Sequence, residues 1–174
     1  MRGPCARGDS GLYAVRHNPP PYFTSLAGCG QHDLPLPALA ADLGGDSLPA
    51  FSFLTPNLCH DTHDCAVTTG DQWLAGEVTR IVQSAAYRAG HTVLFITYDE
   101  GAGGTSNRCA TNQNDAGCHV TTVVISPSTP TGLRSGELFN HYSLLRTTEE
   151  LLGLKPLDAA AQAASMAKPF GLAP

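Results

Sequence analysis

The chain has neither a long hydrophobic run nor a cluster of basic residues. None of its apolar stretches approaches the roughly 18 to 20 residues that cross a membrane, and residues 1–5 (MRGPC) lack the apolar segment of a signal peptide. The chain contains ten Lys and Arg residues and 15 Asp and Glu residues, so its net charge is −5. Because no Lys/Arg run is present, we expect neither a transmembrane segment nor nucleic acid as the main partner.

Charged residues are also scarce, while glycine and proline are frequent. Only 14% of the 174 residues are charged, 42% are hydrophobic, and there are 18 glycines and 13 prolines. This length favours one domain with a buried core, and this composition favours short elements joined by long loops. We therefore expect residues 1–174 to form a single domain.

Six cysteines lie in three sequential pairs, each around a loop rich in Gly, Pro, Asn or Asp. An even number with local spacing indicates disulfides and an oxidising compartment. Six cysteines allow 15 connectivities, so the pairing is a preference based on the positions of the loops, and free thiols are the alternative. The preferred pairs are Cys5–Cys29, Cys59–Cys65 and Cys109–Cys118.

Hydrophobic patterns predict alternating strands and helices. Strands are expected at residues 50–54, 92–97 and 120–126, the second being a continuously apolar, β-branched run typical of a buried parallel strand. Helices are expected at 36–43, at 71–89 with Asp71 as its N-cap, and at 141–152 with Asn140 as N-cap and Gly153 as its end. This order predicts an α/β fold with a mostly parallel sheet flanked by helices.

Acidic and histidine side chains follow these elements in four clusters. Residues 60–64 (HDTHD) follow the first predicted strand, Asp99 and Glu100 follow the second, and His141 begins the last helix; residues 115–119 lie in a loop. Ligands gather at the carboxyl ends of parallel strands in open α/β sheets. Crowded carboxylates and imidazoles favour a divalent cation as their counterion.

Each cluster also has a simpler interpretation. The two acidic clusters at 60–64 and 99–100 suit solvated loops, and His141 suits a helix cap. A structural zinc site formed by Cys59, His60, His63 and Cys65 is a further alternative, although ligands so close in sequence rarely complete a tetrahedron. Asp115 and His119 are expected to be surface residues.

Six segments together resemble the bacterial phosphoesterase family. They are residues 13–19 (YAVRHNP), 22–23 (YF), 53–57 (FLTPN) with 61–64 (DTHD), 70–74 (GDQWL), 97–101 (TYDEG) and 140–149 (NHYSLLRTTE). That family includes secreted acid phosphatases and phospholipases of type C within the alkaline-phosphatase-like superfamily. The resemblance covers nearly the whole chain in the family's order.

The resemblance implies a metal-assisted phosphoric ester hydrolase in which a Ser or Thr hydroxyl attacks phosphorus. Asp99 and Glu100 match the family's metal-binding pair, and Asp61, His63 and His141 match positions that hold a second metal or contact phosphate. Weaker matches, as residues lining the phosphate, are His17, Asn57, His60 and Asp64. Oxygen and imidazole ligands admit Zn, Ca, Mn or Mg.

The family's nucleophile and its Glu-Asn metal pair have no match in the chain. The resemblance therefore implies the C-terminal part of a larger catalytic domain whose N-terminal portion is missing, with little activity of its own, and an intact protein that is secreted. A non-catalytic metal-binding module stapled by disulfides and a phospholipase C acting on lipid head groups are the alternative functions.

Overall fold

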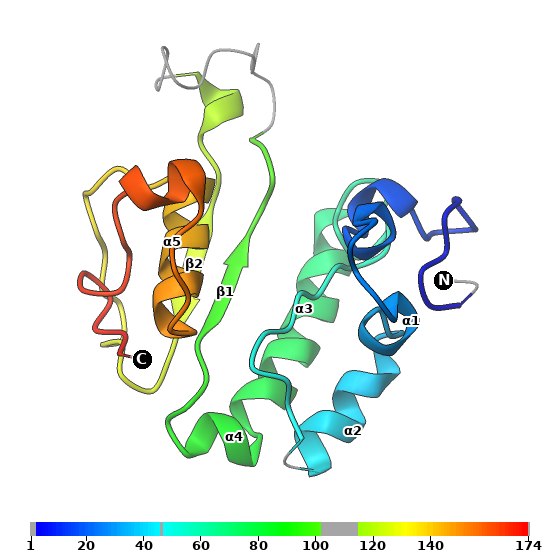
Figure 1. Ribbon diagram of the computed structural model, residues 1–174, viewed down its shortest axis with the longest axis horizontal. Coiled ribbons are helices and arrows are strands. Elements are labelled where there is room, and N and C mark those ends of the chain that lie inside the picture. The colour runs from blue at the N-terminus through cyan, green and yellow to red at the C-terminus, as the bar shows by residue number, and fades with distance from the viewer. Residues whose placement is uncertain (1–2, 46, 102–114, 174) are drawn as a thin grey trace. The chain divides into compact units, whose positions relative to one another are not determined.

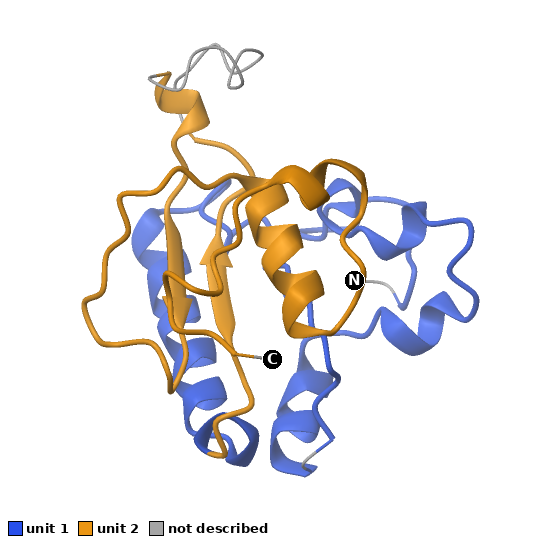
Figure 2. Cartoon of the chain, turned by 60° about the vertical axis from the view of Figure 1, so that its left-hand side comes forward, with its two compact units in different colours: residues 1–88 blue, residues 89–174 orange. Residues whose placement is uncertain are grey.

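The computed structural model describes residues 3–45, 47–101 and 115–173. Their contacts divide the chain into two compact units, residues 1–88 (unit 1) and residues 89–174 (unit 2) (Figure 2). None of the described helices is long and apolar enough to cross a membrane.

Unit 1 is helical, and unit 2 combines two strands with a helix (Figure 1). The helices and strands are α1 (Cys29–His32), α2 (Pro37–Gly45), α3 (Val67–Val82), α4 (Ala85–Arg88), β1 (Leu94–Thr97), β2 (Thr122–Ile125) and α5 (His141–Leu151). Short 3-10 helices are η1 (Val15–His17), η2 (Pro20–Tyr22), η3 (Ala116–Cys118) and η4 (Asp158–Gln162).

In unit 1, helices α2, α3 and α4 pack against one another. The predicted helix at 36–43 is confirmed as α2, but the helix expected at 71–89 begins four residues earlier, with Ala66 as its N-cap. The prediction of Asp71 as the cap is therefore wrong. The helix also ends early, because the Ser84 hydroxyl donates to the Ile81 carbonyl and accepts from the Tyr87 N–H, which forms a turn between α3 and α4.

The predicted strand at residues 50–54 does not form. Phe51 and Phe53 are exposed, and none of the described segments pairs with this stretch. The alternation of apolar and polar residues matched a strand, but a strand also needs a neighbouring backbone to complete its hydrogen bonds.

In unit 2, β1 and β2 confirm the strands predicted at 92–97 and 120–126, and the α/β class is confirmed at this coarse level. Their pairing is antiparallel, with Leu94 opposite Ile125 and Thr97 opposite Thr122. The expected parallel arrangement is wrong for this pair. A parallel pair needs a crossover connection, usually through a helix, whereas the described part of the 98–121 connection contains only the short η3.

Helix α5 packs on η4, and a buried hydroxyl of α5 is hydrogen-bonded on both sides. The Thr147 hydroxyl, fully buried, donates to the Ser143 carbonyl and accepts from the Met166 N–H at 2.8 Å. Asn140 caps α5 through a capping box with Ser143, as its position in the sequence predicts, and Gly153 follows the end of the helix with φ +66°. The capping hydrogen bonds therefore fix the first turn of α5 within unit 2.

Candidate functional site

The predicted site residues of unit 1 lie mainly on one loop, residues 57–65, which is closed by a disulfide. Cys59 and Cys65 are bonded, which confirms that predicted pair and excludes the alternative zinc site, because disulfide sulfurs are not thiolate ligands. At the start of the loop, the Asn57 side chain accepts from the backbone N–H groups of Cys59 and His60 at 3.1 and 2.9 Å. Asn57 thus holds the loop backbone.

Close packing against α3 fixes the middle of the loop. Thr62 has a φ of +72°, which is unusual for a β-branched residue. A Cβ at Gly70 would lie 2.5 Å from the Thr62 Cγ2 and 2.7 Å from the His60 carbonyl oxygen. Only glycine therefore allows the loop to approach the first turns of α3 this closely.

His60 is packed against an aromatic ring of α3. Its imidazole stacks on Trp73 with 5.4 Å between ring centroids and an interplanar angle of 10°. One face of the His60 ring is thus covered by Trp73. The main role of His60 shown by this contact is to pack the loop onto α3.

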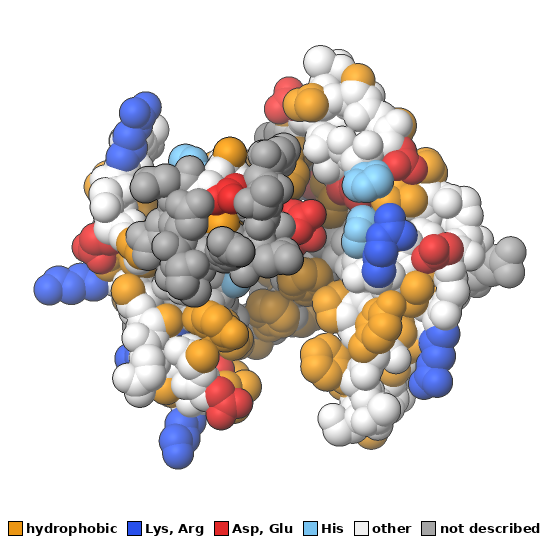
Figure 3. All heavy atoms as spheres, turned by 90° about the horizontal axis from the view of Figure 1, so that it is seen from above, with side chains coloured by type: hydrophobic (Ala, Val, Ile, Leu, Met, Phe, Trp, Pro, Cys, Tyr) orange, Lys and Arg blue, Asp and Glu red, His pale blue; other side chains and the backbone are white. Residues whose placement is uncertain are grey.

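The remaining side chains of the loop form two acid–histidine pairs. Asp61 lies 3.5 Å from the His17 Nδ1, measured from its Oδ2, while its Oδ1 accepts the His63 N–H at 2.8 Å. The His63 Nδ1 lies 2.6 Å from the Asp64 Oδ1. Asp61 is the most buried of the four, with 17% of its side chain exposed, against 62% for His63. Histidine and acidic side chains gather on one face of unit 1 (Figure 3).

The predicted site residues of unit 2 lie beyond the end of β1 and at the start of α5. Asp99 and Glu100 lie just after the strand, separated from it by Tyr98, and are exposed; the Asp99 Oδ1 accepts the Glu100 N–H at 3.0 Å. The His141 Nε2 lies 2.7 Å from the Asp99 carbonyl oxygen. Since a carbonyl only accepts, Nε2 carries the proton and donates. In this arrangement, Nδ1 is the only ring nitrogen with which His141 could bind a metal ion or accept a hydrogen bond.

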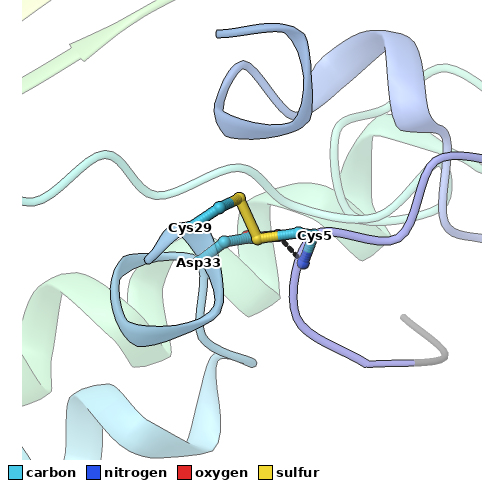
Figure 4. Close-up of side chains that lie close together, drawn as sticks. All are labelled: Cys5, Cys29 and Asp33. Atoms are coloured by element: carbon cyan, nitrogen blue, oxygen red, sulfur yellow. Dashed lines mark hydrogen bonds between the residues drawn. A yellow bond between two sulfur atoms is a disulfide. The ribbon is translucent and has the colours of Figure 1, made fainter. Parts of the chain in front are cut away.

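Another group of potential metal ligands in unit 1 contains none of the predicted metal ligands. Among the described residues, only Cys5, Cys29 and Asp33 form a group of three whose ligand atoms all lie within 4.8 Å of one another (Figure 4). Cys5 and Cys29 are joined by a disulfide, as predicted, and the buried Asp33 accepts from the Cys5 N–H and the Asn18 amide. Because the group has no thiolates, its role is structural: it connects the segments that contain Cys5, Cys29 and Asp33.

The predicted metal ligands do not form such a group of three in the described parts of the chain. Asp61, His63, Asp99, Glu100 and His141 therefore remain a predicted metal set. Their donor chemistry suits a divalent cation, since Asp99 and Glu100 present neighbouring carboxylates to solvent. Cys118 also forms a disulfide, while its predicted partner Cys109 lies outside the described residues.

Residues 6–155 match the phosphoesterase family, and this segment contains every predicted site residue. The chain belongs to the phosphoesterase family. It is 28% identical over 155 residues to a phosphatidylinositol-3-phosphatase from Mycobacterium tuberculosis, a match that covers 89% of this chain and 46% of that protein.

Two fungal relatives of this phosphoesterase are acid phosphatases. The enzyme from Aspergillus niger is 25% identical over 67% of this chain and 26% of its own length. The enzyme from Aspergillus fumigatus is 26% identical over 67% of this chain and 24% of its own length. The chain thus spans less than half of each of these relatives. None of the solved structures matches it.

Several contacts of the site were missed by sequence reasoning. Gly70 and Trp73 lie in residues 70–74, one of the segments that carry the resemblance, but their contacts with the loop at 57–65 were not predicted. The hydrogen bond from His141 to the Asp99 carbonyl was missed as well. A glycine in the first turn of α3, shortly after the loop closed by Cys59 and Cys65, is a sequence signal of this close approach.

Proposed function

We propose that this phosphoesterase contributes to the hydrolysis of phosphoric monoesters. The observation that carries the proposal is the Asp99–Glu100 pair, two exposed neighbouring carboxylates on a turn that His141 anchors, inside the segment that matches the family. In unit 1, Asp61 and His63 are proposed separately as metal or phosphate ligands, with the His17, Asn57, His60 and Asp64 side chains in supporting positions.

Hydrolysis of a phosphomonoester is favoured over the alternative function, a phospholipase C that acts on phospholipid head groups. The relatives bear the names phosphatidylinositol-3-phosphatase and acid phosphatase, and both names describe removal of phosphate from a monoester. The phospholipase C alternative has no comparable support.

We further propose that Asp99 and Glu100 bind a divalent cation. When bound, such an ion neutralises phosphate charge and lowers the pKa of an attacking hydroxyl or water. Their carboxylate oxygens favour a hard ion, while the imidazoles of the proposed set suit zinc, so Zn, Ca, Mn and Mg all remain in the proposal. The nucleophile is proposed to be a Ser or Thr that is missing from residues 1–174, and these residues alone are proposed to hydrolyse little.

Secretion into an oxidising compartment is the proposed setting of the protein. Three cysteine pairs were predicted, and all five cysteines among the described residues form disulfides. Disulfides persist mainly in extracellular or periplasmic surroundings.

Metal binding tests the proposal without depending on the nucleophile. Purified residues 1–174 are dialysed against Zn²⁺, Ca²⁺, Mn²⁺ or Mg²⁺, and we expect binding that Asp99→Ala removes. Glu137→Ala is the matched control, because Glu137 is another exposed carboxylate of unit 2. Equal binding by Asp99→Ala and the unmodified chain would contradict the assignment and favour solvated acidic loops.

Hydrolysis of p-nitrophenyl phosphate tests the expected low activity. We expect little release of p-nitrophenol by residues 1–174 with any of the four metals. Rapid metal-dependent release that Asp99→Ala abolishes would support the phosphatase function but overturn the proposal that the nucleophile is missing.

A further inference from the structure

Gly101, the residue after the Asp99–Glu100 pair, is packed tightly against the turn formed by residues 115–119. Its N–H donates to the Gly117 carbonyl at 3.1 Å. A Cβ at position 101 would lie 2.4 Å from the Ala116 carbonyl oxygen and 2.7 Å from the His119 carbonyl oxygen. Both distances lie well below ordinary contact, so a side chain at position 101 would push the two backbones apart.

The turn that meets Gly101 is itself held in shape. The Asp115 Oδ1 accepts the Gly117 N–H at 2.9 Å, and the Asp115 carbonyl accepts the Cys118 N–H at 2.9 Å. Gly117 is buried, and Cys118 forms a disulfide. Asp115 therefore has a defined structural role in the surface loop where the sequence placed it.

The backbone of residues 99–101 is thus held from two directions within unit 2. His141 donates to the Asp99 carbonyl at 2.7 Å, and Gly117 accepts the Gly101 N–H. The side chains of Asp99 and Glu100 nevertheless remain exposed. A backbone fixed at both ends with two exposed carboxylates is the arrangement that presents ligands without a large ordering cost on binding.

We infer that the turn at residues 115–119 is a positioning element for the Asp99–Glu100 pair, acting through the contact of Gly101 with Gly117. Gly101 and Asp115 are its positioning residues, and neither belongs to the proposed set of metal ligands. The inference rests on the proposed function, because it assigns to this turn the orientation of the proposed metal ligands.

Metal affinity distinguishes positioning from a purely structural role. Loss of groups that orient metal ligands lowers affinity by about 10- to 100-fold. We expect Gly101→Ala and Asp115→Ala each to weaken binding of Zn²⁺ or Mn²⁺ to residues 1–174 by about tenfold. Asp115→Asn keeps an oxygen acceptor for the Gly117 N–H and should restore most of the affinity.

Gly136→Ala is the matched control for the glycine variant. Gly136 lies in unit 2, and a Cβ there would meet nothing within 4 Å. Its metal affinity should equal that of the unmodified chain, and its melting temperature provides the reference for a neutral Gly→Ala change.

Amide hydrogen exchange of the unmodified chain tests the contact even where a variant fails to fold. The Gly101 amide should be protected, and Asp115→Ala should reduce that protection more than Asp115→Asn does. Fast exchange at Gly101 in the unmodified chain would overturn the inference.

The outcomes separate this inference from the proposed function. Unchanged affinity in both Gly101→Ala and Asp115→Ala, with binding lost in Asp99→Ala, would overturn the positioning role and leave the proposed metal site intact. Absence of metal binding by the unmodified chain would overturn both.

Discussion

Gly70 and Gly76 lie on the same helix, α3, but have opposite surroundings. A Cβ at Gly70 would be 2.7 Å from the His60 carbonyl oxygen, whereas one at Gly76 would meet nothing within 4 Å. Gly70→Ala forces the loop at 57–65 away from the helix and should lower the free energy of unfolding by about 1 to 3 kcal/mol, as overpacking does. Chemical denaturation of the purified variants measures this change.

Gly76→Ala is the control, with an effect of opposite sign. Alanine is favoured over glycine inside a helix, so this change should raise the free energy of unfolding by about 0.5 to 1 kcal/mol. Fluorescence adds a local readout, because Trp73 is the only tryptophan of the chain and stacks on His60. If Gly70→Ala left both stability and the Trp73 emission unchanged, the close packing of this loop would be disproved.

The ionisation of the Glu150 carboxylate on α5 is affected by two neighbouring side chains. The hydroxyl of Ser165 donates to it, and Arg146 donates to its other oxygen, and together these lower the pKa of Glu150 below its ordinary value. A lowered pKa in the folded protein contributes stability above the pKa of the unfolded chain, and this contribution is lost as the pH falls through the folded pKa.

Ser165→Ala should therefore raise the pKa of Glu150 toward 4.5 and reduce the loss of stability in acid that this residue causes. NMR titration of the Glu150 carboxyl carbon measures the pKa directly. Ser165→Thr keeps the hydroxyl and should keep the pKa low. An unchanged pKa in Ser165→Ala would show that Arg146 alone accounts for the shift.

Individual elements show which parts of the fold were predictable from sequence. Helix α5 was predicted together with its cap and its end, because Asn140 and Gly153 act through local backbone geometry. For α3, local signals misled: Asp71 is a strong capping residue, yet the helix begins at Val67 and carries Gly70 against the loop at 57–65. The start of α3 was not evident from the capping pattern alone.

Strand pairing was less predictable than strand position. The apolar runs at 94–97 and 122–125 indicated where β1 and β2 lie, but the direction of pairing depends on how the chain returns between them. Contacts between distant residues were also hidden, because the His141–Asp99 hydrogen bond joins residues 42 positions apart. The sequence thus pointed to candidate side chains but not to the contacts that orient them.

At the scale of the whole molecule, disulfides supplement a limited apolar core. The buried hydrophobic residues among those described include only three in unit 1 (Ala14, Leu39, Ile81) and three in unit 2 (Ala160, Met166, Leu172). Small apolar cores are commonly supported by disulfides. Unit 1 holds two of these bonds, which close loops of very different length, with sequence separations of 24 and 6.

Loop length predicts that the two disulfides of unit 1 contribute unequally. Chain entropy assigns about 3.5 kcal/mol to the longer loop of Cys5–Cys29 and about 2 kcal/mol to the shorter loop of Cys59–Cys65. The double variant Cys5→Ser/Cys29→Ser should therefore unfold at a lower denaturant concentration than Cys59→Ser/Cys65→Ser, with the unmodified chain as reference. The reverse order would mean that native contacts around the 57–65 loop, including the Gly70 packing and the His60–Trp73 stack, outweigh the entropy of the unfolded chain.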